Sequence, residues 1–220
     1  MNKETSVRLS KYRRIIQKLK IMGMEKVFSN NLGDAIGVAP ALVRKDLSSL
    51  KIPGHKRGGY NIDELISEMD TILGKNRQMD VIVVGCGKLG SAIMGHRGIY
   101  DEGIKIVAGF DNRPDHVAYK GNIPIYHINK MEDFIRDNNI KIAVMAVPKF
   151  VAADIFRIML DCGIQGLLNF SPAELKDING KCLVNNVNIA IMLENLFFYL
   201  KNQQELDSSA RLIEENNMLM

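Results

Sequence analysis

Three glycines and one aspartate carry the clearest chemistry in this sequence. Gly85, Gly87 and Gly90 form the pattern G-x-G-x-x-G directly after the apolar run Val81–Val84. Where such a run is a strand followed by a helix, the glycines permit a tight turn, close approach of the backbone to a pyrophosphate and close helix packing. Asp111 lies 21 positions beyond Gly90. A carboxylate at the end of the second strand accepts hydrogen bonds from the adenosine ribose, so the pattern favours NAD(H).

The same edge of the expected sheet offers further contacts for a dinucleotide. The helix after the glycines presents free N–H groups and a partial positive charge to phosphates. Two later strand ends, Ala146–Pro148 and Asn169–Pro172, are expected beside it. The alternative is that their prolines mark ordinary transitions from strand to loop without a binding role. Arg113 leaves NADP(H) as the lesser alternative. The residues predicted to bind the cofactor are Gly85, Cys86, Gly87, Lys88, Leu89, Gly90, Asp111, Ala146, Val147, Pro148, Asn169 and Phe170.

A parallel sheet is needed to position these residues, and the sequence from Asp80 onward predicts one. Strands buried on both faces and separated by helices imply an α/β, right-handed, doubly wound Rossmann-type sheet, here over residues 79–186. An apolar helix at Ile189–Leu200 has no place in that sheet, so we expect the segment 187–220 to pack on a partner subunit. The expected strands are 81–84, 104–110, 123–126, 140–147 and 166–168, and the expected helices lie near 88–97, 130–138 and 150–161.

The first 78 residues differ in charge from the rest. They hold 15 of the 29 Lys and Arg residues but 8 of the 25 Asp and Glu residues, a balance typical of a module that binds phosphates. Helices are predicted at 6–22, from Ser29 as N-cap to Gly37, and from Pro40 to about Leu50. A glycine-flanked basic loop at 53–60 predicts a wing, and a fourth helix is expected at 63–73. This order predicts a winged helix-turn-helix domain over residues 1–78.

The third helix of this domain is the expected reading helix, because its apolar inner face leaves basic side chains outside. Side chains there are expected near the major groove, and those of the wing and the first helix on phosphates. A solvated basic surface is the alternative for each of them. The residues predicted to contact DNA are Arg13, Arg14, Arg44, Lys45, Ser48, Lys56 and Arg57.

Composition narrows the remaining classes. Cys86, Cys162 and Cys182 are too few and too scattered for a disulfide framework or a zinc site, so no metal is expected. The sequence has no apolar run near the ~18 residues of a membrane span, and its N-terminus lacks the apolar core of a signal peptide. A protein of a reducing, cytoplasmic compartment is therefore expected.

Two other functional classes stay open. An NAD-dependent oxidoreductase needs a substrate domain, for which the ~20–30 residues after the sheet are too few. His116 and His127 are expected at a loop and a strand end, not in a proton-transfer setting. A coenzyme A binding module uses a similar glycine loop, and Asp111 argues against it in favour of a dinucleotide ribose.

With both parts placed, the chain resembles the Rex family of redox-sensing transcriptional repressors along nearly its full length. A basic reading helix joined to this glycine pattern is a specific combination. The resemblance implies a homodimer with winged-helix domains on double-stranded operator DNA and NAD(H) in the Rossmann domains. It also implies that the C-terminal helix crosses to the partner, that NADH closes the dimer and releases operator, and that NAD+ permits DNA binding. The matching segments are Leu9–Tyr12, Val43–Ser48, Lys56–Tyr60, Gly85–Gly90, Ile123–Tyr126 and Leu168–Pro172.

The chain departs from that family where the nicotinamide is sensed. Family members carry a Tyr at the position of His96 and an Asp at the position of Asn188, and that pair helps to distinguish the reduced from the oxidised cofactor. A hydrogen bond between His96 and Asn188 is one possible replacement for the Tyr–Asp pair. The alternative is that His96 is an ordinary surface or packing histidine without a role in sensing. Cys86 is expected beside a helix N-terminus, which suggests that oxidation of its thiol is a second sensing mechanism. The alternative is that Cys86 is an ordinary buried cysteine with no role in sensing.

Overall fold

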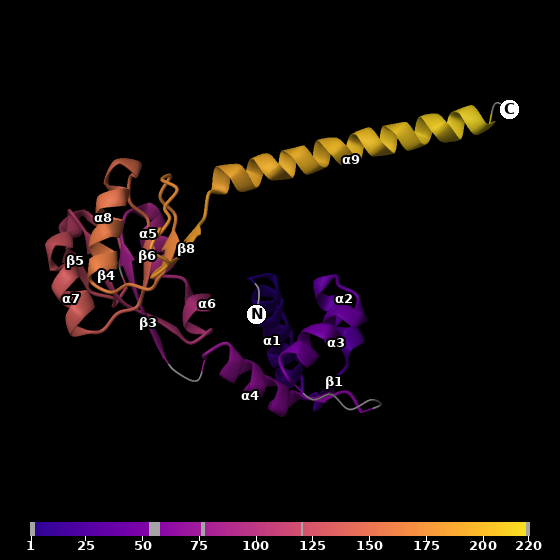
Figure 1. The fold of residues 1–220 in the computed structure, drawn as a ribbon, viewed down its shortest axis with the longest axis horizontal. Coiled ribbons are helices and arrows are strands. Elements are labelled where there is room, and N and C mark those ends of the chain that lie inside the picture. Colours follow the sequence, from indigo (N-terminus) through magenta and orange to yellow (C-terminus); the bar gives the residue numbers. More distant parts are fainter. Residues whose placement is uncertain (1–2, 53–57, 76–77, 120, 219–220) are drawn as a thin grey trace. The chain divides into compact units, whose positions relative to one another are not determined.

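The computed structural model describes the backbone of residues 3–52, 58–75, 78–119 and 121–218, with side chains in these ranges between residues 4 and 203. Contacts divide the chain into two compact units, residues 1–78 and 79–220 (Figure 1). Each unit buries hydrophobic clusters of its own.

The N-terminal unit is helical with a small two-stranded sheet. β1 and β2 pair antiparallel, with Val27 opposite Tyr60. Gly23, with φ 81°, follows α1, and Gly37, with φ 72°, ends α2 in the left-handed conformation that glycine accepts most easily. The elements are α1 (Lys3–Ile21), β1 (Lys26–Val27), α2 (Ser29–Ile36), α3 (Pro40–Ser49), β2 (Tyr60–Asn61) and α4 (Ile62–Ile72).

The start of α2 differs from the sequence prediction. Ser29 is predicted as the N-cap, but Phe28 occupies that position. The Asn31 side chain accepts the Phe28 N–H at 3.0 Å. The Ser29 hydroxyl instead accepts a hydrogen bond from Arg44 Nη1 at 3.0 Å and so links α2 to α3. Of the predicted wing, residues 53–57 lie outside the described residues, residues 58 and 59 lead into β2, and Tyr60 begins it.

A polar cluster ties α1 to α3 beneath the surface of this unit. Arg8 donates from Nε and Nη2 to the two carboxylate oxygens of Asp46, at 2.7 and 2.9 Å. The fully buried Tyr12 donates its hydroxyl to Asp46 at 3.1 Å. The Arg8 guanidinium lowers the pKa of Asp46, while burial, reinforced by the Asp46 carboxylate, raises the pKa of Tyr12 to about 12. Asp46 thus joins the reading helix to the body of the unit.

The second unit contains a six-stranded sheet in which every paired strand is parallel. The order β5-β4-β3-β6-β7-β8 is that of a Rossmann sheet, with the strand order reversing around β3. β8 is absent from the sequence prediction because it is a mostly exposed edge strand without a run of buried residues. The strands are β3 (Met79–Val84), β4 (Ile104–Asp111), β5 (Ile125–His127), β6 (Ile142–Met145), β7 (Gly166–Asn169) and β8 (Leu183–Asn186).

Helices cover both faces of this sheet (Figure 1). Residues of α7 and α8 form one buried cluster with the sheet, and residues of α5 and α6 pack in the other. The helix expected near 88–97 is interrupted at Gly95 and His96, so it forms two short helices. The helices are α5 (Lys88–Met94), α6 (Arg97–Tyr100), α7 (Met131–Asp137), α8 (Lys149–Asp161) and α9 (Ile189–Met218), with short 3-10 helices at Pro114–His116 and Ile128–Lys130.

The C-terminal helix α9 extends the predicted Ile189–Leu200 as far as Met218. Its first turns expose large apolar side chains, such as Phe197 at 73% and Tyr199 at 65%. A contiguous apolar surface of this kind marks an interaction site.

Candidate dinucleotide site and DNA-reading helix

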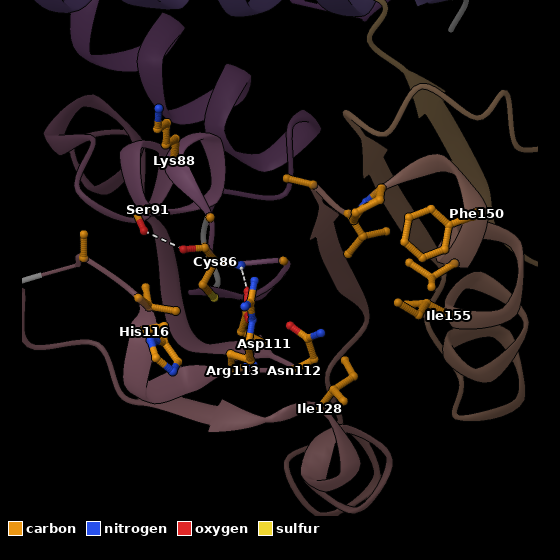
Figure 2. A pocket seen from close by; sticks show the side chains of 18 of the residues that line it. Cys86, Lys88, Ser91, Asp111, Asn112, Arg113, His116, Ile128, Phe150 and Ile155 are labelled. Carbon is orange, nitrogen blue, oxygen red and sulfur yellow. Dashed lines mark hydrogen bonds between the residues drawn. The ribbon is translucent and has the colours of Figure 1, made fainter.

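A cavity of about 1220 Å3 opens at the carboxyl ends of β3, β4 and β6. These strands meet where the strand order reverses, which is the place where open α/β sheets bind ligands. Figure 2 shows residues of the glycine loop on one side of the cavity and Phe150 and Ile155 of α8 on another. The volume is sufficient for a large nucleotide ligand.

The three glycines have distinct geometric roles. Gly85 has φ +88°, and a Cβ there would lie 2.7 Å from the Ala146 carbonyl carbon. Gly90 packs so closely on Gly85 that a Cβ would overlap the Gly85 carbonyl oxygen. Gly87 is the N-cap of α5 and has open space where a Cβ would be, so its backbone is free to approach a ligand. The loop is therefore shaped to hold a pyrophosphate.

Asp111 holds this loop in place from the end of β4. Its Oδ2 accepts the Cys86 N–H at 2.8 Å (Figure 2), and its Oδ1 accepts the Arg113 N–H at 2.9 Å. The Ser91 hydroxyl donates to the Cys86 carbonyl at 2.7 Å from the first turn of α5. The carboxylate lines the cavity with acceptor capacity left for ribose hydroxyls, so the residues present fit a dinucleotide.

The cavity includes most of the predicted cofactor residues. Leu89 and Gly90 do not line the cavity. The Leu89 side chain is 40% exposed at the surface outside the cavity, and Gly90 packs closely against Gly85. The predicted residues that line the cavity are Gly85, Cys86, Gly87, Lys88, Asp111, Ala146, Val147 and Pro148.

Asn169 and Phe170 do not line this cavity, and their contact with the cofactor stays a prediction. The Asn169 side chain is fully buried, and its amide donates to the Ala173 carbonyl at 2.7 Å and to Asn186 at 2.8 Å. Its oxygen accepts the Ser171 N–H at 2.9 Å. Phe170 packs against the buried cluster on the α5 face of the sheet. Asn169 therefore joins the loop after β7 to the edge strand β8.

Several lining residues were missed from the sequence. Most of them follow β4 or occupy the first turns of α8, while Ser91 lies in α5 and Ile128 follows β5. The loops after neighbouring strands were the available signal. The residues that complete the cavity wall are Ser91, Asn112, Arg113, His116, Val117, Ala118, Ile128, Phe150, Val151, Asp154 and Ile155.

Cys86 has the opposite of the environment expected for a reactive thiol. Its side chain is fully buried, and its Sγ lies 3.6 Å from the Phe110 carbonyl oxygen. Burial, reinforced by the Asp111 carboxylate, raises the pKa of the thiol to about 12. The nearby helix N-terminus does not offset these effects, so thiol oxidation at Cys86 is not a sensing mechanism that this site favours.

We expect Cys86 to resist thiol reagents in the folded protein at pH 7. The thiolate is the reactive form, and with a pKa near 12 almost none is present. The measurement is mass-spectrometric mapping of alkylation over time, with the partly exposed Cys162 as an internal control that reacts first. Labelling of Cys86 as fast as Cys162, without denaturant, would restore the thiol hypothesis.

The two nicotinamide-sensing candidates lie in different settings. His96 is exposed in the link between α5 and α6, where its ring lies over Gly98. Asn188 precedes α9, and its side chain accepts the Ile191 N–H at 3.2 Å. Asn188 thus caps the apolar helix, and a bond between His96 and Asn188 stays a prediction.

The reading helix α3 presents its polar face to solvent. Arg44, Lys45 and Ser48 are exposed, while Val43 and Leu47 are fully buried. Arg44 is oriented by its bond to the hydroxyl at the start of α2. These three side chains are therefore available to base edges and phosphates.

Arg13 and Arg14 differ although they are neighbours. Arg13 is 7% exposed and pairs with Asp70 of α4, with Gln17 accepting from its Nη1 at 3.0 Å. Arg13 thus has a structural role in the unit, and its contact with phosphate stays a prediction. Arg14 is exposed on α1 and stays a candidate. Lys56 and Arg57 lie outside the described residues.

No helix in the described ranges is both long and apolar enough to cross a membrane. Among those same residues, His, Cys, Asp and Glu side chains form no group of three that would hold a metal ion.

A helix-turn-helix unit with an exposed basic helix, joined to a Rossmann unit with an open dinucleotide cavity, defines a DNA-binding regulator with a nucleotide-binding domain. The redox-sensing transcriptional repressor Rex of Carboxydothermus hydrogenoformans is 36% identical over 198 residues, which cover 90% of this chain and 95% of that protein. The chain therefore belongs to the Rex family of redox-sensing transcriptional repressors. Rex of Desulforamulus reducens is 34% identical over 89% of this chain and 93% of its own.

Family models and solved structures agree with this assignment. The model described as "Putative DNA-binding protein N-terminus" matches residues 2–48, and the one described as "CoA binding domain" matches residues 76–173. RSP, a Rex-family repressor, matches with a TM-score of 0.81 at 26% identity over 96% of this chain and 98% of its own. RSP in complex with β-NAD+ and operator DNA matches with a TM-score of 0.85 at 27% identity, over 96% and 97% of the two chains.

Proposed function

We propose that this protein is a transcriptional repressor that binds operator DNA as a homodimer and responds to NADH and NAD+. The observation that carries the proposal is the presence, in one chain, of an exposed basic reading helix and a glycine-loop cavity closed by Asp111. RSP, similar along 94% of this chain, has also been solved with β-NADH. The dinucleotide is the signal here and no catalytic step is assigned, and a cytoplasmic location follows from DNA binding.

The cofactor is held by its adenosine diphosphate half. The N–H groups at the start of α5 face the pyrophosphate, with Lys88 beside them, and Asp111 accepts from the ribose. The nicotinamide supplies the redox signal, since its two forms differ in charge and ring shape. A response to that difference requires contacts that distinguish the two protein states.

Dimerisation through α9 follows from its exposed side chains. The side chains of Leu193, Leu196 and Leu200 are more than half exposed. Exposure of so much apolar surface to water is unfavourable, so burial of this surface against a partner is favoured. A second copy of the chain covers this surface in the proposed dimer. Two reading helices on one dimer then meet two half-sites of a symmetric operator.

The decisive experiment compares operator affinity with NAD+, with NADH and without cofactor, at one stated salt concentration. The operator is first selected from random duplexes with the NAD+-loaded protein. We expect NADH to weaken binding by about 5–150-fold relative to NAD+, the usual range of coupling between sites. Coenzyme A serves as a competitor, because one matching family model carries its name. Equal operator affinity in all three states would refute the redox response.

Lys45→Ala is expected to lower operator affinity about tenfold and leave NADH affinity unchanged. Lys45 is exposed on α3, and a base contact is worth about 1–3 kcal/mol. Fluorescence anisotropy with labelled operator measures the effect. The control is Lys75→Ala, which removes the same charge outside α3. If both variants bind operator as the unmodified protein does, Lys45 has no part in reading DNA.

A further inference from the structure

One wall of the dinucleotide cavity is built by the first turns of α8. Phe150 lines the cavity and is 84% exposed, and Val151 and Ile155 lie next to it, half-buried. Figure 2 places Phe150 and Ile155 on the α8 side, across the cavity from Asp111 and Asn112. The aromatic ring is therefore part of a larger apolar wall, unlike a single scattered surface residue.

The packing of α8 does not use Phe150. The helix buries Ala152, Phe156 and Met159 against the sheet. Phe150 lies on the opposite, exposed row, one turn before Asp154 and two turns before Arg157. That row is otherwise polar, as expected for a surface helix. Phe150 belongs to none of the hydrophobic clusters that the described residues form.

The proposed binding mode leaves this wall for the adenine end of the ligand. With the pyrophosphate at the start of α5 and the ribose on Asp111, the rest of the cavity, whose wall includes residues of α8, would hold the base. Resting on the proposed cofactor function, we propose that Phe150 and Asp154 recognise the adenine ring. Phe150 packs on the face of the base, and Asp154 accepts a hydrogen bond from its exocyclic amino group.

These two contacts supply different parts of the recognition. Aromatic packing tolerates any base, because every base has a π-face. A carboxylate accepts from an amino group but repels a carbonyl oxygen, so Asp154 separates adenine from bases that carry oxygen at position 6. Asp154 pairs with Arg157 at 3.2 Å, with both side chains 73% exposed, so this ion pair contributes little to stability. Both residues can therefore be changed without unfolding the sheet.

The experiment titrates the full chain with NADH and with its hypoxanthine analogue, nicotinamide hypoxanthine dinucleotide in reduced form, followed by fluorescence. The unmodified protein is expected to prefer NADH about tenfold, as for one hydrogen bond to a charged group. Asp154→Asn brings the ratio close to one, because an amide also donates to a carbonyl oxygen. Phe150→Ala weakens both ligands about tenfold at an unchanged ratio, and Phe150→Tyr restores both affinities.

The matched control is Asp161→Asn, which removes the same charge from the exposed row of α8 outside the cavity. It is expected to bind both dinucleotides as the unmodified protein does. Equal affinity of the unmodified protein for NADH and the hypoxanthine analogue would overturn the role of Asp154, and full affinity in Phe150→Ala would overturn that of Phe150. Absence of any NADH binding would instead overturn the proposed cofactor function, and this assignment with it.

Discussion

Asp46→Ala is expected to abolish operator binding while NADH binding survives. Asp46 accepts two hydrogen bonds from Arg8 and one from Tyr12, and its side chain is 6% exposed. Removing one partner of a buried ion pair costs about 3–5 kcal/mol. A domain has only about 5–15 kcal/mol to lose. Because the second unit has its own buried clusters, the damage is confined to the DNA-binding unit.

Thermal unfolding by calorimetry, operator binding and NADH titration together measure this separation of effects. The control is Asp63→Ala, whose carboxylate pairs with Lys20 where the side chains are 72% and 56% exposed. Such an exposed pair contributes about 0–1 kcal/mol, so the control retains operator binding. An Asp46→Ala protein with unchanged unfolding and operator affinity would show that the cluster does not hold α3 in place.

The same cluster predicts a pH dependence with a definite sign. The pKa of Asp46 is lowered in the folded protein, mainly by the hydrogen bond from Arg8. Its stabilisation is therefore complete above the ordinary Asp value and is lost as pH falls through the lowered value. The free energy of unfolding, measured as a function of pH, is therefore expected to decrease on the acid side.

The sheet could be predicted from sequence because its central strands are buried and apolar. The runs at β3 and β4 are separated by helical segments of the expected length, which fixes a parallel sheet. The edge strand β8 carries no such signal, since Leu183 is 81% exposed and Asn185 and Asn186 follow closely. Hydrogen bonding to β7 makes it a strand, and that partner is set by topology.

The candidate site likewise has one part that the sequence predicts and another that only the fold shows. The glycine loop is contiguous in sequence, so its function can be inferred from a short pattern. The structural roles of Arg13 and Asn169 could not be predicted, because their partners, Asp70 and Asn186, lie 57 and 17 positions away. A polar side chain next to a strand end or in a basic run looks available until the fold supplies its partner. Phe150 was missed for the converse reason, since only the fold shows that its exposed ring lines the cavity.

Asp111→Ala is expected to lower NADH affinity about 100-fold. The carboxylate is positioned for the ribose, and hydrogen bonds to a charged group contribute about 1.5–3 kcal/mol each. It also accepts the Cys86 N–H, so its removal leaves the glycine loop without this anchor, and it accepts the Arg113 N–H, which orders the loop after β4. Asp111→Asn keeps the shape and one acceptor, and an intermediate loss of about tenfold is expected. Calorimetric titration with NADH and with ADP-ribose measures both variants.

Asp115→Ala is the matched control, because it removes the same charge from the exposed 3-10 helix that follows β4. It is expected to keep NADH affinity, and both Asp111 variants are expected to keep operator binding without cofactor, since the DNA-binding unit has a core of its own. The carboxylate also excludes a 2′-phosphate, while Arg113 on the cavity wall attracts one. Asp111→Ala should therefore narrow the preference for NADH over NADPH. Unchanged affinity for NADH and an unchanged preference would place the ribose elsewhere in the cavity.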